Sequence, residues 1–132
     1  MSFRWDDFVP LAAELSQVAD SDPLCEAKWR TAVSRAYYAA FHRVGQFYRE
    51  RHGGQTPASE VLEYGGRRRE LGTHEALIVA LAQGSDLERK VGLVLSRMRR
   101  ARRWADYQSR PVSADQATAE VDRAARLLAA LR

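Results

Sequence analysis

The sequence predicts an all-α fold, an up-and-down helical bundle of about five helices in which residues 1–132 form a single domain. No stretch alternates apolar and polar residues as a half-buried strand does, whereas apolar residues recur every three or four positions through most of the chain. Glycine, proline and capping residues gather at a few places and divide the chain into helical segments. With 132 residues, of which 45% are hydrophobic, the chain is long enough to bury one core.

Two helices are predicted before the first pair of glycines. Residues 6–18 carry an apolar stripe at helical spacing, made of Phe8, Leu11, Ala12, Leu15 and Val18. The Ser-Asp-Pro tripeptide at 21–23 is typical of a helix start, because a polar cap precedes a proline at the first helical position. We expect this second helix to continue to about residue 52, where Gly53 and Gly54 end it, and to bury Trp29, Val33, Tyr37, Ala40, Val44, Phe47 and Tyr48.

An irregular segment separates the second helix from the third. Residues 53–72 are rich in glycine and predict a loop with room for one helical turn at residues 58–64. Thr73 is expected to cap a third helix that ends at about residue 83. His74, in the first turn behind this cap, is interpreted as a cap-region residue rather than a catalytic one.

The last two predicted helices both begin at polar capping residues. The Gly-Ser-Asp sequence at 84–86 breaks the chain and caps a fourth helix at 87–107, whose inward residues are Leu87, Val91, Val94, Leu95, Met98, Ala101 and Ala105. Ser113 and Gln116 have the spacing of a capping box, which predicts a final helix at 114–131.

Composition excludes several classes of protein. No apolar run approaches the roughly 18 residues of a membrane helix, and the first ten residues are more acidic than basic, unlike a secretory signal, so we expect a cytoplasmic protein with no membrane partner. The single cysteine, Cys25, allows neither an internal disulfide nor a cysteine metal cluster. His42, His52 and His74 are not spaced as a ligand set. We therefore predict no metal and no cofactor.

The positive charge of the chain is concentrated in arginines. The net charge is +4, the pI is about 9.6, and all but two of the 21 basic residues are arginine. A general preference of the genome for arginine would explain the total, but not a row in which Arg97, Arg99, Arg100, Arg102 and Arg103 fall close together. Because guanidinium groups pair with phosphate oxygens in a two-point manner, this row predicts binding to a nucleic-acid backbone by Arg97, Arg99, Arg100 and Arg103.

Four blocks, in chain order, resemble the HEPN family, the small all-helical domains of prokaryotic toxin–antitoxin, defence and RNA-processing systems. They are RTAVSRAYYAAFHRV at 30–44, GTHEAL at 72–77, RRARRWADYQ at 99–108 and SADQATAEVDRAARLLAAL at 113–131. The resemblance covers nearly the whole chain. It implies a HEPN-like bundle and an RNA-targeting toxin that cleaves RNA without a metal ion.

The resemblance also places candidate catalytic residues near the end of the fourth helix. The family's arginine falls on Arg102, its polar neighbour on Arg103 and its histidine on Tyr107, within the pattern Arg-x-x-Ala-Asp-Tyr that includes Asp106. A tyrosine with a pKa of about 10 is a weaker proton acceptor at neutral pH than an imidazole with a pKa of about 6.5. Two interpretations stay open: a ribonuclease using Arg102, Tyr107 and Asp106, or a non-catalytic HEPN module that binds a nucleotide, RNA or a partner protein. In the second case, Arg102 and Asp106 are a structural pair.

A second polar face lies on the helix that contains the two adjacent tyrosines. Arg35, Tyr38 and His42 share this face, which suits either a cleft or exposure to solvent. At about 140° apart on an ideal helix, Arg102 and Tyr107 would share a pocket only if the helix bends or a second subunit closes over them.

We further predict a homodimer. Tyr38, His42, Trp104 and Tyr107 exceed what one bundle core buries, and the small residues Ala32, Ala36 and Ala39 would allow close contact with another helix. The family resemblance implies, in addition, a nucleotidyltransferase antitoxin as partner.

Overall fold

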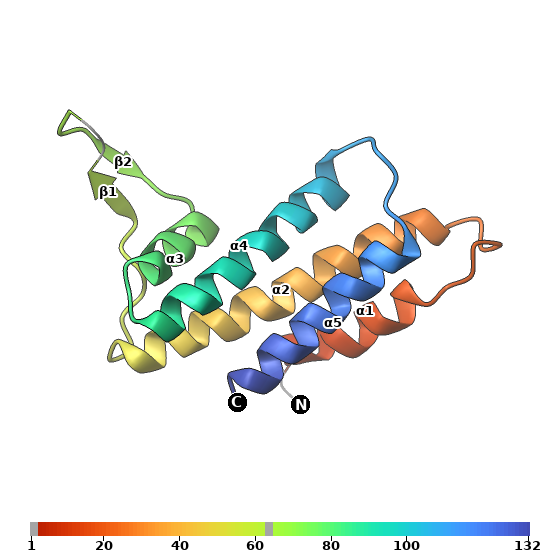
Figure 1. The fold of residues 1–132 in the computed structure, drawn as a ribbon, viewed down its shortest axis with the longest axis horizontal. Coiled ribbons are helices and arrows are strands. Elements are labelled where there is room, and N and C mark those ends of the chain that lie inside the picture. The colour runs from red at the N-terminus through yellow and green to blue at the C-terminus, as the bar shows by residue number, and fades with distance from the viewer. Residues whose placement is uncertain (1–2, 63–64) are drawn as a thin grey trace.

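The computed structural model describes residues 3–62 and 65–132, and helices dominate it (Figure 1). In chain order the elements are η1 (Trp5–Asp7, a 3-10 turn), α1 (Phe8–Ser16), α2 (Cys25–Arg51), β1 (Glu60–Leu62), β2 (Arg68–Glu70), α3 (Thr73–Ala82), α4 (Asp86–Tyr107) and α5 (Ala114–Ala130). The all-α class and the five α-helices within the described residues are as the sequence predicts. No helix in this part of the chain is long and apolar enough to cross a membrane.

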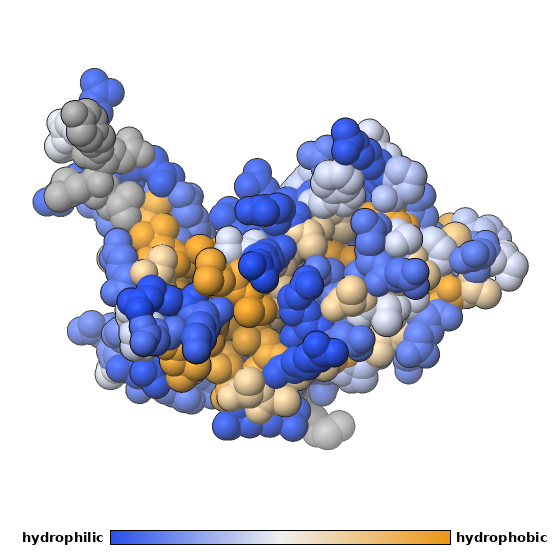
Figure 2. All heavy atoms as spheres, in the orientation of Figure 1, coloured by the Kyte–Doolittle hydropathy of each residue, from blue (hydrophilic) through white to orange (hydrophobic). Residues whose placement is uncertain are grey.

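The long helix α2 is the centre of the fold. Helices α1, α4 and α5 pack against it, while α3 packs mainly against α4 (Figure 1). The largest fully buried side chains are Tyr37, Val44, Leu81, Leu95 and Met98. Charged groups cover much of the surface, and an apolar band crosses the face on which α4 and α5 lie in front of α2 (Figure 2).

The small residues of α2 are used inside the subunit. Ala32, Ala36 and Ala39 are each 0% exposed, because helices packed on α2 cover them. They therefore offer no surface to a second subunit, and this part of the argument for a homodimer is wrong. Two leucines that were expected to face inward, Leu11 and Leu87, are instead 42% and 48% exposed. In α1 the buried face passes through Ala12 and Ser16, and in the first turn of α4 it passes through Glu88.

The segment after α2 forms a hairpin where a loop was expected. Strands β1 and β2 pair antiparallel, with Glu60 opposite Glu70 and Leu62 opposite Arg68. The helical turn predicted at residues 58–64 is wrong for residues 58–62, which contain strand β1 and no helix. Residues 63 and 64 of this prediction lie outside the described part of the chain. A pairing of three residues per strand is too short to reveal a period in the sequence, so the hairpin was missed.

The expected helix starts meet with two outcomes. The predicted capping box of Ser113 with Gln116 is present at α5, and the cap predicted at residues 84–86 is a capping box of Ser85 with Glu88 at α4. Thr73, however, is the first helical residue of α3, and Gly72 occupies the cap position without a side-chain bond. At the start of α2, the helix begins at Cys25 rather than at the proline. The Asp22 carboxylate there accepts the Leu24 N–H at 2.8 Å and forms an ion pair with Lys28.

Candidate functional site

The side chain of Arg102 lies on the two adjacent tyrosines of α2. Its guanidinium carbon is 5.5 Å from the ring centre of Tyr37 and 5.4 Å from that of Tyr38. The Arg102 side chain is only 11% exposed, and its Nε atom is buried with no hydrogen-bond partner. A guanidinium in this position is held in part by cation–π contacts, which do not occupy its N–H groups.

Helix α3 brings His74 to the same tyrosine. The Nδ1 atom of His74 lies 2.6 Å from the Tyr37 hydroxyl oxygen, and the imidazole stacks on Phe41 with the ring centres 4.1 Å apart. Burial raises the pKa of Tyr37 to about 12, so its hydroxyl stays protonated at neutral pH. The Tyr37 hydroxyl can donate to Nδ1 or accept from Nδ1–H, and in the second arrangement Nε2 carries a free lone pair.

The surroundings of His74 favour a neutral imidazole. Burial lowers the pKa of His74 below its usual value of 6.5, and the positive charges of Arg102, Arg99 and His42 lower it further. Arg99 resembles Arg102 in having a buried Nε atom without a partner. The site thus combines a neutral histidine with two arginines, and such an excess of positive charge suits an anionic ligand.

The structure brings the three predicted catalytic residues together. Arg102 Nη1 lies 3.3 Å from Asp106 Oδ2, and the Arg102 guanidinium carbon is 5.9 Å from the ring centre of Tyr107. Tyr107, the last residue of α4, is 73% exposed. The length of the Arg102 side chain bridges the angle between the two positions on the helix, so neither a bend nor a second subunit is needed for this contact.

The predicted cleft on α2 is partly covered by the start of the chain. The Trp5 ring stacks on His42 with ring centres 3.6 Å apart, and the Arg35 guanidinium lies over the rings of Phe8 and Tyr38. Burial lowers the pKa of His42, and Arg49 lowers it further. The sequence did not indicate that residues 3–7 contact this face of α2, so the stacking of Trp5 on His42 was missed.

Three of the four arginines that were predicted to bind nucleic acid line one hollow. Arg99, Arg100 and Arg103 surround a space of about 320 Å³, which Trp104 also borders. Arg97 is exposed outside this group. Within the described residues no ion pair engages Arg97, Arg99, Arg100 or Arg103. Their charges are therefore available to phosphate groups.

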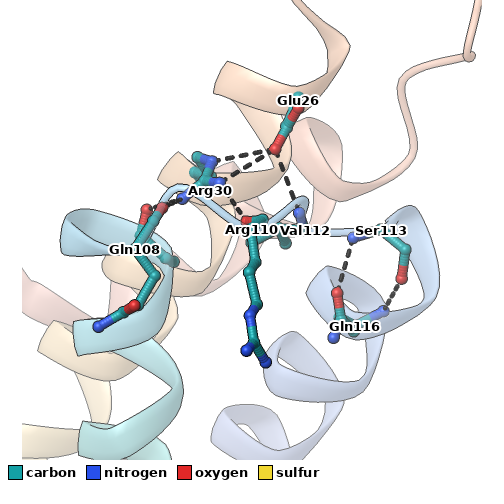
Figure 3. A network of polar contacts seen from close by, with 8 residues as sticks. Glu26, Arg30, Gln108, Arg110, Val112, Ser113 and Gln116 are labelled. Atoms are coloured by element: carbon teal, nitrogen blue, oxygen red, sulfur yellow. Dashed lines mark hydrogen bonds and ion pairs between the residues drawn. The ribbon is translucent and has the colours of Figure 1, made fainter.

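A clamp from α2 fixes the end of α4 that carries these side chains (Figure 3). The Arg30 guanidinium donates to the carbonyl oxygens of Ala105, Gln108 and Arg110 at 2.6, 2.9 and 2.5 Å. The Glu26 carboxylate pairs with Arg30 at 3.0 Å and accepts the Val112 N–H at 3.2 Å. Arg30 thereby pairs one carbonyl group in the last turn of α4, that of Ala105, and two in the segment that follows the helix. Sequence reasoning missed this clamp, although the spacing of Glu26 and Arg30 on one helix face was visible.

No three His, Cys, Asp or Glu side chains lie close enough together to hold a metal ion in the part of the chain that the structure describes. Comparison with protein-family models, with curated proteins and with solved structures finds no match to this chain.

Proposed function

We propose that this protein is an RNA-targeting, HEPN-like toxin component of a toxin–antitoxin system, which cleaves RNA without a metal ion at the Arg102–Tyr37–His74 site. One observation carries the proposal. Arg102 and His74, from different helices, contact the same tyrosine, so an anion-binding guanidinium lies beside a neutral imidazole. Phosphodiester cleavage requires both groups, one to bind the phosphate and one to accept a proton.

The proposed reaction is attack by a ribose 2′-hydroxyl on the adjacent phosphorus. His74 Nε2 takes the proton of the 2′-hydroxyl while Nδ1–H donates to the Tyr37 hydroxyl oxygen, at the observed 2.6 Å. The bond from the 2′-oxygen to phosphorus forms, and the bond from phosphorus to the 5′-oxygen breaks. Arg102 stabilises the negative charge of the pentacoordinate phosphorus. The 5′-oxygen leaves with a proton from water, His74 returns its proton to solvent, and the product ends in a 2′,3′-cyclic phosphate.

Tyr107 and Asp106 take supporting roles in this proposal. Asp106 holds one nitrogen of Arg102, and Tyr107 covers the guanidinium from the solvent side. His74 supplies the imidazole that α4 lacks at residue 107. Further phosphates of the RNA lie in the hollow formed by Arg99, Arg100 and Arg103, and affinity falls steeply with salt as counterions are displaced.

A second candidate function is favoured by a different observation. Arg102 is already paired with Asp106, and a paired guanidinium binds an additional anion less strongly. In this case the chain is a non-catalytic module that binds RNA, a nucleotide or a partner protein. Retained binding of RNA without any cleavage over hours identifies this second function.

We propose that the active form is a homodimer and that an adjacent nucleotidyltransferase antitoxin inhibits it. Support for the dimer comes from large apolar side chains of α4 that the subunit leaves uncovered, since Leu93 is 62% and Tyr107 73% exposed. Sedimentation at tens of micromolar protein tests this, and a monomer at that concentration contradicts it.

The cleavage proposal is tested with purified protein, a fluorogenic single-stranded RNA and EDTA in the buffer. We expect cleavage in EDTA, and a loss of about 100-fold or more in the variant Arg102→Ala, because its charge stabilises the transition state. Lys90→Ala is the matched control, since this exposed lysine lies in the other half of α4. Equal cleavage by Arg102→Ala and the control excludes Arg102 from catalysis, and cleavage that EDTA abolishes contradicts the metal-free reaction.

A further inference from the structure

A second hollow lies between α4 and α5, and Trp104 borders both this hollow and the hollow of the arginines. Both helices pack against α2, and they diverge from each other in the upper half of the view (Figure 1). The space between them measures about 330 Å³, and its apolar lining includes Val33, Ala101 and Val112. Its polar lining consists of Trp104 and Gln116 with the carboxyl group of Glu120.

Two polar atoms in the lining residues have no partner. Trp104 Nε1 and Glu120 Oε2 are both buried without a hydrogen bond. Glu120 is 9% exposed, and only its other oxygen is engaged, by Arg123 at 2.5 Å. Leaving a buried donor or acceptor unpaired is energetically unfavourable. A buried donor and a buried acceptor, both left unpaired in residues that line the same hollow, indicate a ligand that carries the complementary groups.

The shape and neighbours of the hollow restrict that ligand. Trp104 is a wall of this hollow and also of the hollow formed by Arg99, Arg100 and Arg103. A molecule that occupies both spaces has a phosphate on one side and a flat, largely apolar group with polar edges on the other. A nucleotide in single-stranded RNA has this composition, and proteins commonly bind such bases unstacked.

Among the four bases, guanine fits the two unpaired atoms best. Its Watson–Crick edge presents an acceptor, O6, next to two donors, N1–H and N2–H. A carboxylate accepts from adjacent N–H groups, and an indole N–H donates to O6. Adenine, cytosine and uracil each lack the pair of adjacent donors beside a carbonyl oxygen.

We propose that the hollow between α4 and α5 binds an unstacked guanine of the RNA, with Glu120 accepting from N1–H and N2–H and Trp104 Nε1–H donating to O6. The site therefore determines sequence specificity. This inference rests on the proposed RNA binding but not on cleavage, because the base pocket and the Arg102–Tyr37–His74 site use different residues.

The experiment uses fluorescein-labelled 2′-O-methyl hexanucleotides, which cannot be cleaved by 2′-hydroxyl attack. We compare UUUGUU, UUUAUU and UUUUUU by fluorescence anisotropy at one salt concentration. We expect UUUGUU to bind about tenfold more tightly than the other two, as for one well-formed carboxylate–guanine pair. Glu120→Gln should abolish this preference and leave the affinity for UUUUUU unchanged. Asp122→Asn, two positions away on α5 and exposed, is the control and should keep the preference.

Two further variants keep the test decisive if Glu120→Gln fails to fold. Ala119→Leu fills the hollow from an exposed position of α5, and Trp104→Phe removes the N–H while keeping an aromatic ring. Either should remove the preference for guanine. Equal affinities of the wild-type protein for the three oligonucleotides would overturn the guanine site. Preference for guanine without cleavage of ordinary RNA contradicts the proposed reaction alone, whereas no binding of any oligonucleotide overturns both.

Discussion

At its first turn α4 places Glu88 beside His52, and near its last turn it places Arg102 beside Tyr37 and His74. In the first region the polar groups are paired: Glu88 receives hydrogen bonds from the Ser85 N–H and from His52 Nε2, the latter at 2.5 Å. In the second region buried nitrogen atoms of arginine have no partner. Polar groups that the chain satisfies by itself stabilise the fold, whereas those it leaves open are available to a ligand.

The largest expected difference between the two regions is seen when the histidine of each is substituted: one substitution should reduce activity and the other should reduce stability. We expect His74→Gln to lower RNA cleavage about 100-fold or more, because it removes the proton acceptor, and to change the melting temperature little. His52→Gln should leave the cleavage rate unchanged at 25 °C and lower the free energy of unfolding by about 1–2 kcal/mol, because Glu88 loses one of its two hydrogen-bonding neighbours. Cleavage kinetics and urea denaturation measure the two effects. If both variants lose activity and stability alike, the two ends of α4 do not differ as we infer.

The next prediction concerns the clamp that holds the functional end of α4. Arg30→Ala removes the donor to three backbone carbonyl oxygens and leaves the Glu26 carboxylate without its ion-pair partner. We expect the free energy of unfolding to fall by about 2–3 kcal/mol. Urea denaturation measures this loss, with Arg126→Ala, an exposed arginine of α5, as the control. A loss no larger than that of the control contradicts a role for Arg30 in the fold.

The features that the sequence predicted correctly are those encoded by neighbouring residues. The Ser113–Gln116 capping box and the buried stripe through Val33, Tyr37 and Val44 depend on spacings of three or four positions. Arg102 was also chosen as the central site residue from the sequence. The position of His74 in the first turn behind Thr73 favoured a cap-region residue, so the sequence did not indicate its place in the site.

The missed contacts all join distant parts of the chain. Tyr37 and His74 are 37 positions apart, and Arg30 and Arg110 are 80 positions apart. Such pairs depend on how α2, α3 and α4 cross, which a single sequence does not specify. The hairpin of β1 and β2 was missed for a different reason, because three residues per strand are too few to show a period in the sequence.

A third prediction contrasts two buried carboxyl groups by their response to pH. The hydrogen bond from His52, together with those from Ser85, lowers the pKa of Glu88 from 4.5 to about 2. Its folded-state pKa is below the unfolded value, so its stabilisation is complete above pH 4.5 and is lost as the pH falls towards about 2. Burial raises the pKa of Glu120, so its contribution is largest below pH 4.5 and is lost as the pH rises through the raised pKa.

The two glutamine variants separate these contributions. Glu88→Gln should be less stable than wild type at pH 6, by about 1–2 kcal/mol, with the difference vanishing near pH 2. Glu120→Gln should be as stable as wild type at pH 6 or more so, since it removes a buried charge that is only partly paired. Thermal unfolding at a series of pH values measures both. A destabilisation of Glu120→Gln at pH 6 as large as that of Glu88→Gln shows that the carboxyl group between α4 and α5 is structural.

The smallest expected effect is a difference in RNA affinity between a variant in the second half of α4 and a variant in its first half. Arg103 borders the arginine hollow near the functional end, and Lys90 is exposed in the first half of the same helix. Each variant, Arg103→Ala and Lys90→Ala, removes one positive charge, so an effect of net charge alone would be equal in both. We expect only Arg103→Ala to weaken binding of a 2′-O-methyl RNA, by about threefold for every base sequence, and to reduce the slope of log affinity against log salt by about one. Anisotropy titrations between 50 and 200 mM salt measure the slope. Because a phosphate contact releases a fixed number of counterions, a reduced affinity with an unchanged slope contradicts a direct contact of Arg103 with the backbone.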